Sequence, residues 1–341
     1  MNILMIGPSI DAKGGMSTVI KNMYEYEGED QIKVVSNWHE KHRISLFLKN
    51  IFTIRKIIKE EKIDIVHFHV AQKGSFYRKS LLLFLLPKKV KSVFHIHASQ
   101  FDLFYHEASR RKKRIIRKCL GRADLIVAVS ESWQEFYQKI TDTPVEFVNN
   151  AVKMPQENQY QTTAKRILTL GRIGERKGSY DLLKVAKIVG KSYPEVVFEV
   201  YGDGEIEHFR QLANQLSNVK INGWINQEEK SELFQHTLLH FLPSYNEGLP
   251  MAILETMSCG IPNVATTVGG IPQLIADNED GFLTKPGNIE EMSKKILLYL
   301  EKNTTEKVEI SEKAFTKIKK DFSLDSYMEK WHRIYVYLMA Q

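Results

Sequence analysis

The sequence predicts an α/β protein made of two doubly wound, Rossmann-like domains that face one another across a cleft. Short apolar runs of strand length alternate with segments of helical periodicity from the first residues onward. A polar, turn-rich stretch at 153–164 interrupts this alternation, and the same pattern restarts at residue 166. The length of 341 residues is also what two domains of ordinary size require.

We therefore expect an N-terminal domain over residues 1–157 and a C-terminal domain over residues 158–324. The remaining stretch, 325–341, predicts one long helix from Asp325 to Met339 that crosses back and packs on the first domain. Its apolar stripe at helical spacing consists of Met328, Trp331, Tyr335 and Leu338.

The composition is that of a globular protein, with 43% hydrophobic and 26% charged residues. No run approaches the roughly 20 apolar residues that span a bilayer. Residues 2–6 already have the pattern of a strand, without a basic flank or a cleavage site, so no signal peptide is predicted and a cytoplasmic location is expected. Cys119 and Cys259 are expected to be reduced, buried thiols rather than a disulfide or metal ligands.

The net charge of +7 is concentrated in the first half of the chain. Residues 1–160 hold 26 Lys and Arg against 17 Asp and Glu, whereas residues 161–341 hold 22 against 24. The densest basic cluster is Arg110–Lys118, and Lys88 and Lys89 follow the apolar run 81–86. Such segments suit an anionic membrane surface or a phosphorylated substrate, although a solvated helix face explains them equally well. Nucleic acid is disfavoured because aromatic residues are not interleaved with the charges.

The first domain begins with a strand over 2–6, followed by Gly14-Gly15 and a helix from Met16. A glycine pair at this place lets a ligand approach the backbone closely. Ser130, with Ser132 and Glu135, is expected to cap the helix after the fifth strand. The other expected elements are strands at 32–36, 65–69, 92–97, 124–129 and 145–148 and helices at 46–61 and 78–86.

Four histidines lie on two successive strands of this domain. Period two places His67 and His69 on one face, and likewise His95 and His97. His97 stands at the carboxyl end of its strand, where open α/β sheets bind ligands. No carboxylate or cysteine accompanies the histidines at ligand spacing, so we expect no metal and a structural role for His67 and His95.

The second domain repeats the alternation of strands and helices. Its expected strands are 166–170, 196–201, 219–224, 238–243 and 263–265. Its expected helices are 180–189, a segment ending at 216, 227–235, one that begins with Pro250 and ends before Gly260, and 290–301.

The turn 171–178 places Arg172 and Lys177 among three glycines directly after the strand 166–170. Arg172 can grip phosphate oxygens with two parallel hydrogen bonds, and Lys177 acts as a point charge. Together they would neutralise a diphosphate without a metal. Taken alone, the turn would equally be a basic surface turn.

The segment 244–262 predicts a loop followed by a short helix. Glu247 lies in the loop, and Glu255 lies five residues past Pro250, about 7.5 Å along the helix at roughly 1.5 Å per residue. Free backbone amides and the positive helix dipole prepare this helix start for an anion. By themselves, the two glutamates would be a turn residue and a solvated helix residue.

With Gly-Arg and Lys-Gly at 171–178, and Glu, seven residues and Glu at 247–255, the chain resembles the retaining, GT-B-fold glycosyltransferases of family 4 (group 1). The resemblance runs from Gly14-Gly15 to the closing helix. One departure is Asn149-Asn150-Ala151, where many relatives carry Asn-Gly, so Asn150 receives no role.

The resemblance implies a role for each matching residue. Arg172 and Lys177 would bind the donor diphosphate and stabilise the leaving nucleotide in place of a metal. Glu247 would hold hydroxyls of the donor sugar, and Glu255 would accept hydrogen bonds from the ribose. The further implied donor contacts are Gly14, Gly15, His97, Gly202, Ile225, Gly248 and Leu249.

The resemblance also implies a hexosyl- or N-acetylhexosaminyltransferase of polysaccharide biosynthesis. It would move a sugar with retention from a UDP-sugar to a lipid-linked or cell-surface glycan, without metal or cofactor, in the cytoplasm or on the inner face of the cytoplasmic membrane. The sequence contains no Asp-x-Asp, which agrees with this expectation. The alternatives are a non-catalytic nucleotide-sugar-binding subunit, a glycosidase that uses Glu247 and Glu255 as acid and nucleophile, and a 2-epimerase.

Overall fold

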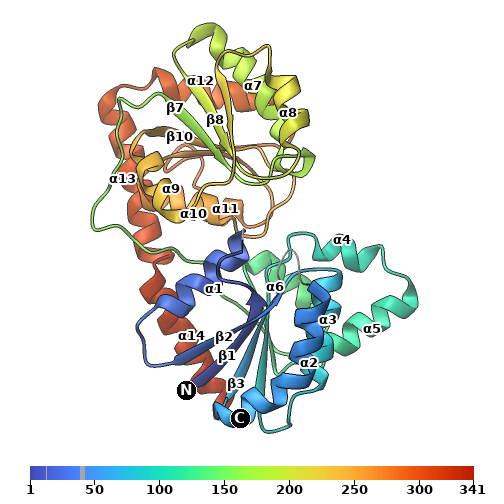
Figure 1. Ribbon diagram of the computed structural model, residues 1–341. Helices are drawn as coiled ribbons and strands as arrows, with labels where there is room; N and C mark the ends of the chain where they lie inside the picture. The colour runs from blue at the N-terminus through green and yellow to red at the C-terminus, as the bar shows by residue number, and fades with distance from the viewer. Residues whose placement is uncertain (13, 39–42) are drawn as a thin grey trace. The chain divides into compact units, whose positions relative to one another are not determined.

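The computed structural model describes residues 1–12, 14–38 and 43–341, and it divides into two compact units (Figure 1). The first unit combines Met1–Ala151 with Leu324–Gln341, and the second is Val152–Ser323. The C-terminal helix therefore belongs to the first unit, and the polar stretch 153–164 opens the second. Among the described residues, no helix is both long enough and apolar enough to cross a bilayer.

The first unit is built on a sheet of six parallel strands in the order β2-β1-β3-β4-β5-β6. These strands are β1 (Asn2–Pro8), β2 (Gln31–Trp38), β3 (Ile65–Val70), β4 (Lys91–Ile96), β5 (Leu125–Ala128) and β6 (Val145–Phe147). Every residue of β3 and β5 is buried, as expected of parallel strands that are covered on both faces.

The helices of the first unit include one from the far end of the chain. They are α1 (Gly15–Glu25), α2 (Arg43–Glu60), α3 (Gly74–Phe84), α4 (Phe101–His106), α5 (Arg110–Leu120), α6 (Glu131–Gln138) and α14 (Leu324–Met339). The predicted stripe of α14 is buried throughout, at Met328, Trp331, Tyr335 and Leu338. Tyr335 bonds to His67 of β3, which places α14 against the sheet of the first unit.

The second unit repeats this plan with the strand order β12-β11-β10-β7-β8-β9, again all parallel. The strands are β7 (Arg166–Leu170), β8 (Val197–Tyr201), β9 (Val219–Asn222), β10 (Thr237–Leu242), β11 (Asn263–Thr266) and β12 (Phe282–Thr284). The helices are α7 (Ser179–Ser192), α8 (Ile206–Ala213), α9 (Gln227–Gln235), α10 (Met251–Ser258), α11 (Ile271–Leu274), α12 (Ile289–Glu301) and α13 (Thr304–Asp321).

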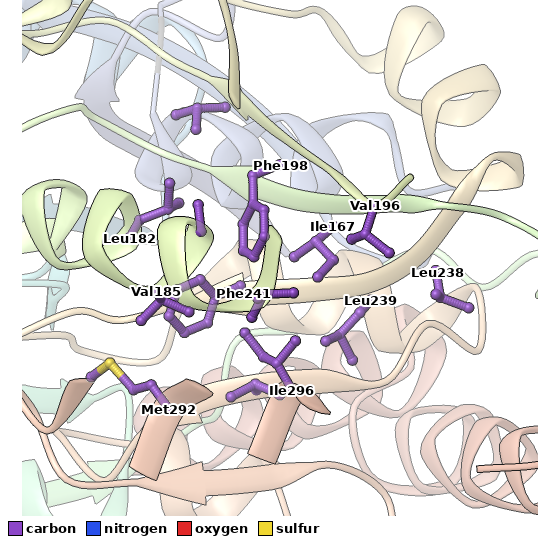
Figure 2. Close-up of a cluster of buried hydrophobic side chains, with 14 of the residues drawn as sticks. Ile167, Leu182, Val185, Val196, Phe198, Leu238, Leu239, Phe241, Met292 and Ile296 are labelled. Carbon is purple, nitrogen blue, oxygen red and sulfur yellow. The ribbon is translucent and has the colours of Figure 1, made fainter. Parts of the chain in front are cut away.

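The core of the second unit lies where α7 and α12 meet the sheet. Figure 2 shows Leu182 and Val185 of α7 and Met292 and Ile296 of α12 in one cluster with strand side chains. Phe198 of β8 and Phe241 of β10 contribute their rings to it, with centroids 6.4 Å apart. This core supports the strands whose carboxyl ends carry the predicted donor residues.

Helix α13 was not expected from the sequence. Lysine and glutamate are frequent in it, but its buried residues Ile310, Ala314 and Ile318 recur at helical spacing. A second signal lies at its start, where Asn303 and Glu306 form a capping box with side-chain-to-backbone distances of 3.0 and 2.9 Å. Strand β12 also lacked a prediction.

Two local predictions were wrong. Pro250 is the N-cap of α10, in an extended conformation, and the first helical residue is Met251. Ser130 occupies the N-cap position of α6, but its side chain makes no capping hydrogen bond and instead lies 3.1 Å from the hydroxyl of Ser132. A serine hydroxyl in this position can bond either to a backbone amide of the helix or to a nearby side chain, and here it bonds to the hydroxyl of Ser132.

Candidate functional site

The predicted donor residues of the second unit follow the carboxyl ends of four neighbouring strands. Strands β10, β7, β8 and β9 lie side by side in that order, and all run in the same direction. Gly171 follows β7, Gly202 follows β8 and Glu247 lies in the loop after β10. The structure therefore brings these loops to one edge of the sheet, which is the ligand-binding edge of open α/β folds.

The glycine turn 171–178 is packed closely against neighbouring strand ends. Gly178 has a left-handed φ of 66°, and a Cβ there would overlap the carbonyl oxygen of Pro243. A Cβ on Gly202 would overlap the carbonyl oxygen of Gly171. Gly202 is thus required by the approach of one backbone segment to another, whatever its role toward a nucleotide.

Lys177 and Glu247 form a partly buried ion pair. Lys177 Nζ lies 2.5 Å from Glu247 Oε1, and the hydroxyl of Ser244 donates to the same oxygen at 2.7 Å. The side chains are only 16% and 7% exposed. Removing one member of such a pair leaves the other buried without its partner, so the two side chains hold each other in position.

Arg172 is the solvent-exposed cation of the turn. Its side chain is 69% exposed, and its closest acidic neighbour, Asp203, is 4.0 Å away. At this exposure the contact with Asp203 contributes little. The guanidinium is therefore available for the two parallel hydrogen bonds that a phosphate accepts.

Arg176 was not singled out by its sequence, but it ties the glycine turn to the Glu247 loop. Its guanidinium donates to the carbonyl oxygen of Asn246 at 2.9 Å, and its own carbonyl accepts from the amide of Tyr245 at 2.9 Å. Gly270 donates its amide to the carbonyl oxygen of Gly248 at 2.6 Å. The loop that carries Glu247 is consequently held from both sides.

Glu255 lies in α10, four residues after Met251, and its side chain is 3% exposed. Lys230 of α9 donates to Glu255 Oε2 at 2.7 Å. The other oxygen, Oε1, is buried and has no hydrogen-bond partner among the described residues. At the start of α10, Ile253 and Leu254 donate their amides to the carbonyl oxygen of Pro250 at 3.2 and 3.4 Å, so the amides of Met251 and Ala252 are those that helix geometry leaves without an intrahelical acceptor.

A cavity of about 320 Å³ adjoins the turn that contains Ile225. Its lining is mixed, with aromatic, acidic and basic side chains. It is lined by Arg166, Tyr201, Gly223, Trp224, Ile225, Glu229, Glu232, Leu233 and His236. The predicted base contact at Ile225 thus borders a cavity, while Ile225 itself is buried.

In the first unit, the four histidines form one group of contacting rings at the expected place. The rings of His67 and His69 are parallel with centroids 4.4 Å apart, and those of His95 and His97 are 3.9 Å apart. Hydrogen bonds join His67 to His95 at 3.2 Å and His69 to His97 at 3.0 Å. His97 lies just past β4, which ends at Ile96, and it is half-buried.

The histidine group is uncharged at neutral pH. Burial lowers the pKa values of His67, His69 and His95 well below 6.5. Burial, with the nearby amino group of Lys79, lowers the pKa of His97 to about 3. Nitrogens of His67, His69 and His95 lie within 4.8 Å of one another, a spacing that a metal would accept. However, His67 bonds through both ring nitrogens, to Tyr335 and to His95, and no carboxylate joins this group among the described residues.

Gly14 and Gly15 lie where the sequence predicts them, between β1 and α1. Gly14 is the N-cap of α1, with φ 120°, and a Cβ there would meet no atom within 4 Å. Space at this position is therefore open. Both glycines follow the carboxyl end of β1, the same edge of the sheet at which His97 follows β4.

Two family models match consecutive parts of the chain. "Glycosyltransferase Family 4" matches residues 14–154, and "Glycosyl transferases group 1" matches residues 152–317. Together they span residues 14–317, which include every residue of the predicted site.

Individual relatives and a solved structure agree with this match. An uncharacterised glycosyltransferase of Haemophilus influenzae is 28% identical over 290 residues, which is 82% of this chain and 78% of that protein. The UDP-Gal:alpha-D-GlcNAc-diphosphoundecaprenol alpha-1,3-galactosyltransferase of Escherichia coli is 25% identical over 272 residues, 71% of this chain and 68% of that protein. The structure of Anabaena Alr3699/HepE with UDP-glucose matches with a TM-score of 0.75 at 19% identity, over 98% of this chain and 99% of that one. The chain therefore belongs to the group 1 glycosyltransferases of the GT-B fold.

Proposed function

We propose that this glycosyltransferase moves a hexosyl or N-acetylhexosaminyl group from a UDP-sugar to a lipid-linked or cell-surface glycan, with retention at the anomeric carbon. The observation that carries the proposal is the meeting of Arg172, Lys177 and Glu247 at one sheet edge. The Escherichia coli relative, named for UDP-Gal and a diphosphoundecaprenol acceptor, and the neighbour with UDP-glucose support the donor and acceptor classes.

The second unit supplies the proposed donor site. Arg172 grips the diphosphate with its exposed guanidinium, and Lys177 adds a charge that its pair with Glu247 holds in place. The start of α10, with the nearby amides of Gly248 and Leu249, supports the same negative charge. Glu247 holds hydroxyls of the sugar, Glu255 holds the ribose, and Gly202 and Ile225 border the nucleotide.

The proposed reaction needs no metal and no enzyme nucleophile. The bond between the sugar's anomeric carbon and the diphosphate oxygen breaks as the acceptor hydroxyl attacks from the same face. The departing phosphate oxygen takes the hydroxyl proton, and the cations stabilise the charge that develops on the leaving group. From the first unit, we assign His97 to the donor sugar and Gly14 and Gly15 to the phosphates. His97 acts as a neutral hydrogen-bonding group, since its pKa is about 3.

The test is a nucleotide-release assay with a panel of UDP-sugars, run in EDTA. Arg172→Ala and Glu255→Ala should each lower turnover at least about 100-fold, because each removes a contact to the departing nucleotide. Arg333→Ala is the matched control, since this arginine is 77% exposed and lies on α14. Unchanged turnover in both site variants would refute the proposal.

Each alternative function predicts a different experimental result. A nucleotide-sugar-binding subunit would bind the donor but transfer sugar only after a partner protein is added. A glycosidase that used Glu247 and Glu255 would release sugar from a glycan without nucleotide. The glycosidase is disfavoured, because Glu247 and Glu255 are each engaged by a lysine.

We further propose that the first unit docks on an anionic membrane through a basic apolar surface, formed by the exposed faces of α3 and α5. Tyr77, Leu81 and Phe84 recur at helical spacing on α3 and are 37%, 46% and 42% exposed. Helix α5 carries the exposed run Arg110–Lys112, together with Ile115, which is 50% exposed. Helix α4 links the two, through ring contact between Tyr77 and Phe104 and a hydrogen bond from Arg117 to Tyr105.

Charge reversal tests this surface. Changing Arg110, Arg111, Lys112 and Lys113 to glutamate should lower binding to phosphatidylglycerol-containing vesicles at low salt at least about tenfold, because each cation contributes about 1 kcal/mol near such a surface. Sedimentation with the vesicles measures it, and Lys184→Glu with Lys187→Glu and Lys191→Glu on exposed α7 positions is the control. Equal binding by both variants would exclude this surface.

A further inference from the structure

The ion pair between Lys230 and Glu255 connects α9 to α10 beside the predicted ribose position. Lys230 Nζ lies 2.7 Å from Glu255 Oε2, and the side chains are 14% and 3% exposed. Neither the composition of α9 nor its periodicity marks Lys230. Its burial and its partner distinguish it from the ordinary exposed lysines of the chain.

The start of α9 fixes the place of Lys230. Asn226 and Glu229 form a capping box, with both side-chain-to-backbone hydrogen bonds at 2.9 Å. The amide of Lys230 then donates to the carbonyl oxygen of Asn226 at 3.1 Å, in the first turn of the helix. The Lys230 side chain therefore extends from a capped, well-defined helix start.

The carboxylate of Glu255 is engaged on one side only. Oε2 is bound by Lys230, whereas Oε1 is buried and without a hydrogen-bond partner in the part of the chain that the structure describes. A buried carboxylate oxygen that lacks a donor is costly, and native structures rarely keep one without a function. The acceptor capacity of Oε1 is thus unused in the protein by itself.

We propose that Lys230 is a positioning residue that holds Glu255 so that Oε1 accepts a hydrogen bond from a ribose hydroxyl of the donor nucleotide. This inference rests on the donor site proposed above. Lys230 compensates the buried charge and occupies Oε2, which leaves Oε1 for the ligand. The site consequently selects ribonucleotides over deoxyribonucleotides, because an analogue without the hydroxyl leaves Oε1 unpaired.

A merely structural ion pair between α9 and α10 would behave differently. Its loss would lower the melting temperature and weaken the binding of all nucleotides by similar factors. The positioning role predicts a change in the ratio of two affinities. That ratio is insensitive to a general loss of stability.

The experiment measures nucleotide binding by isothermal titration calorimetry. The unchanged protein and its Lys230→Met and Lys230→Arg variants are each titrated with UDP, 2′-deoxy-UDP and 3′-deoxy-UDP. The unchanged protein should prefer UDP over at least one deoxy analogue by about 10- to 100-fold. Lys230→Met should lose most of this preference, chiefly through weaker binding of UDP, and Lys230→Arg should restore it. Lys184→Met, at a lysine that is 63% exposed in α7, is the matched control.

The possible outcomes separate the two proposals. A preference that persists in Lys230→Met overturns the positioning role, as does an unchanged protein that binds UDP and both analogues equally. Failure to bind UDP, and likewise GDP and ADP, counts against the donor site itself. Lys230→Gln, which keeps a donor, replaces the methionine variant if the latter does not fold, and it should then retain only part of the preference.

Discussion

Lys177→Met should lower kcat/KM for sugar transfer by about 100- to 1000-fold, which is the usual cost of losing one preorganised group that stabilises developing charge. The lysine sits 2.5 Å from Glu247 and is 16% exposed, so it is held in place before any ligand binds. Its loss removes a fixed positive charge from the proposed diphosphate position. Steady-state kinetics with a saturating acceptor would measure the effect.

The buried partner complicates this result, and a double-mutant cycle resolves it. Lys177→Met alone leaves Glu247 without its cation, so part of the loss could arise from a displaced loop. Glu247→Gln and the double variant complete the cycle, and melting temperatures are measured for all four proteins. If the double variant regained the full activity of the unchanged protein, Lys177 would serve only as the partner of Glu247, and its proposed role on the phosphates would be wrong.

Mild acid should destabilise the first unit through its histidine group. In the folded state the pKa values of His67, His69 and His95 lie well below 6.5, and that of His97 is about 3. In the unfolded chain these histidines have their ordinary pKa of about 6.5. As the pH falls below this value, the unfolded state therefore binds protons that the folded state does not. Stability is therefore complete above this pH and falls below it, by up to about 1.4 kcal/mol per pH unit for each histidine.

Hydrogen exchange of amides in β3 and β4 between pH 7 and 5 measures this loss, after correction for intrinsic exchange rates. The window lies above the ordinary titration range of carboxylates, which limits their contribution. His95→Gln should make the dependence on pH shallower by about one proton, while His208→Gln, at an exposed position on α8, should leave it unchanged. A dependence equally steep in His95→Gln and the unchanged protein would contradict the explanation.

The alternation of strands and helices was predictable because most elements are long enough to display their period. Strand β7 and helix α9 have the predicted bounds. Helix α13 was not predicted, although its buried residues recur at helical spacing and a capping box marks its start. Strand β12 was not predicted either.

The residues of the candidate site also divide into those that the sequence predicted and those that it did not. Arg172, Lys177, Glu247 and Glu255 could be named in advance, because the glycine turn and the two spaced glutamates together resemble the pattern of a known family. Lys230 and Arg176 could not. Each acts on a segment distant in the sequence, Glu255 for Lys230 and Asn246 for Arg176, and no local pattern encodes such a contact.

The sequence by itself determined the fold class, the repeated α/β plan, the basic first half and the residue types that suit a sugar nucleotide. Only the tertiary structure decided that Lys177 and Glu247 are an ion pair, that Glu255 keeps one oxygen without a partner among the described residues, and that Tyr335 contacts His67, which lies 268 positions away in the chain. The physical reason is that residue type and period are local properties. Burial, pairing and pKa depend on which distant segments the parallel sheets bring together.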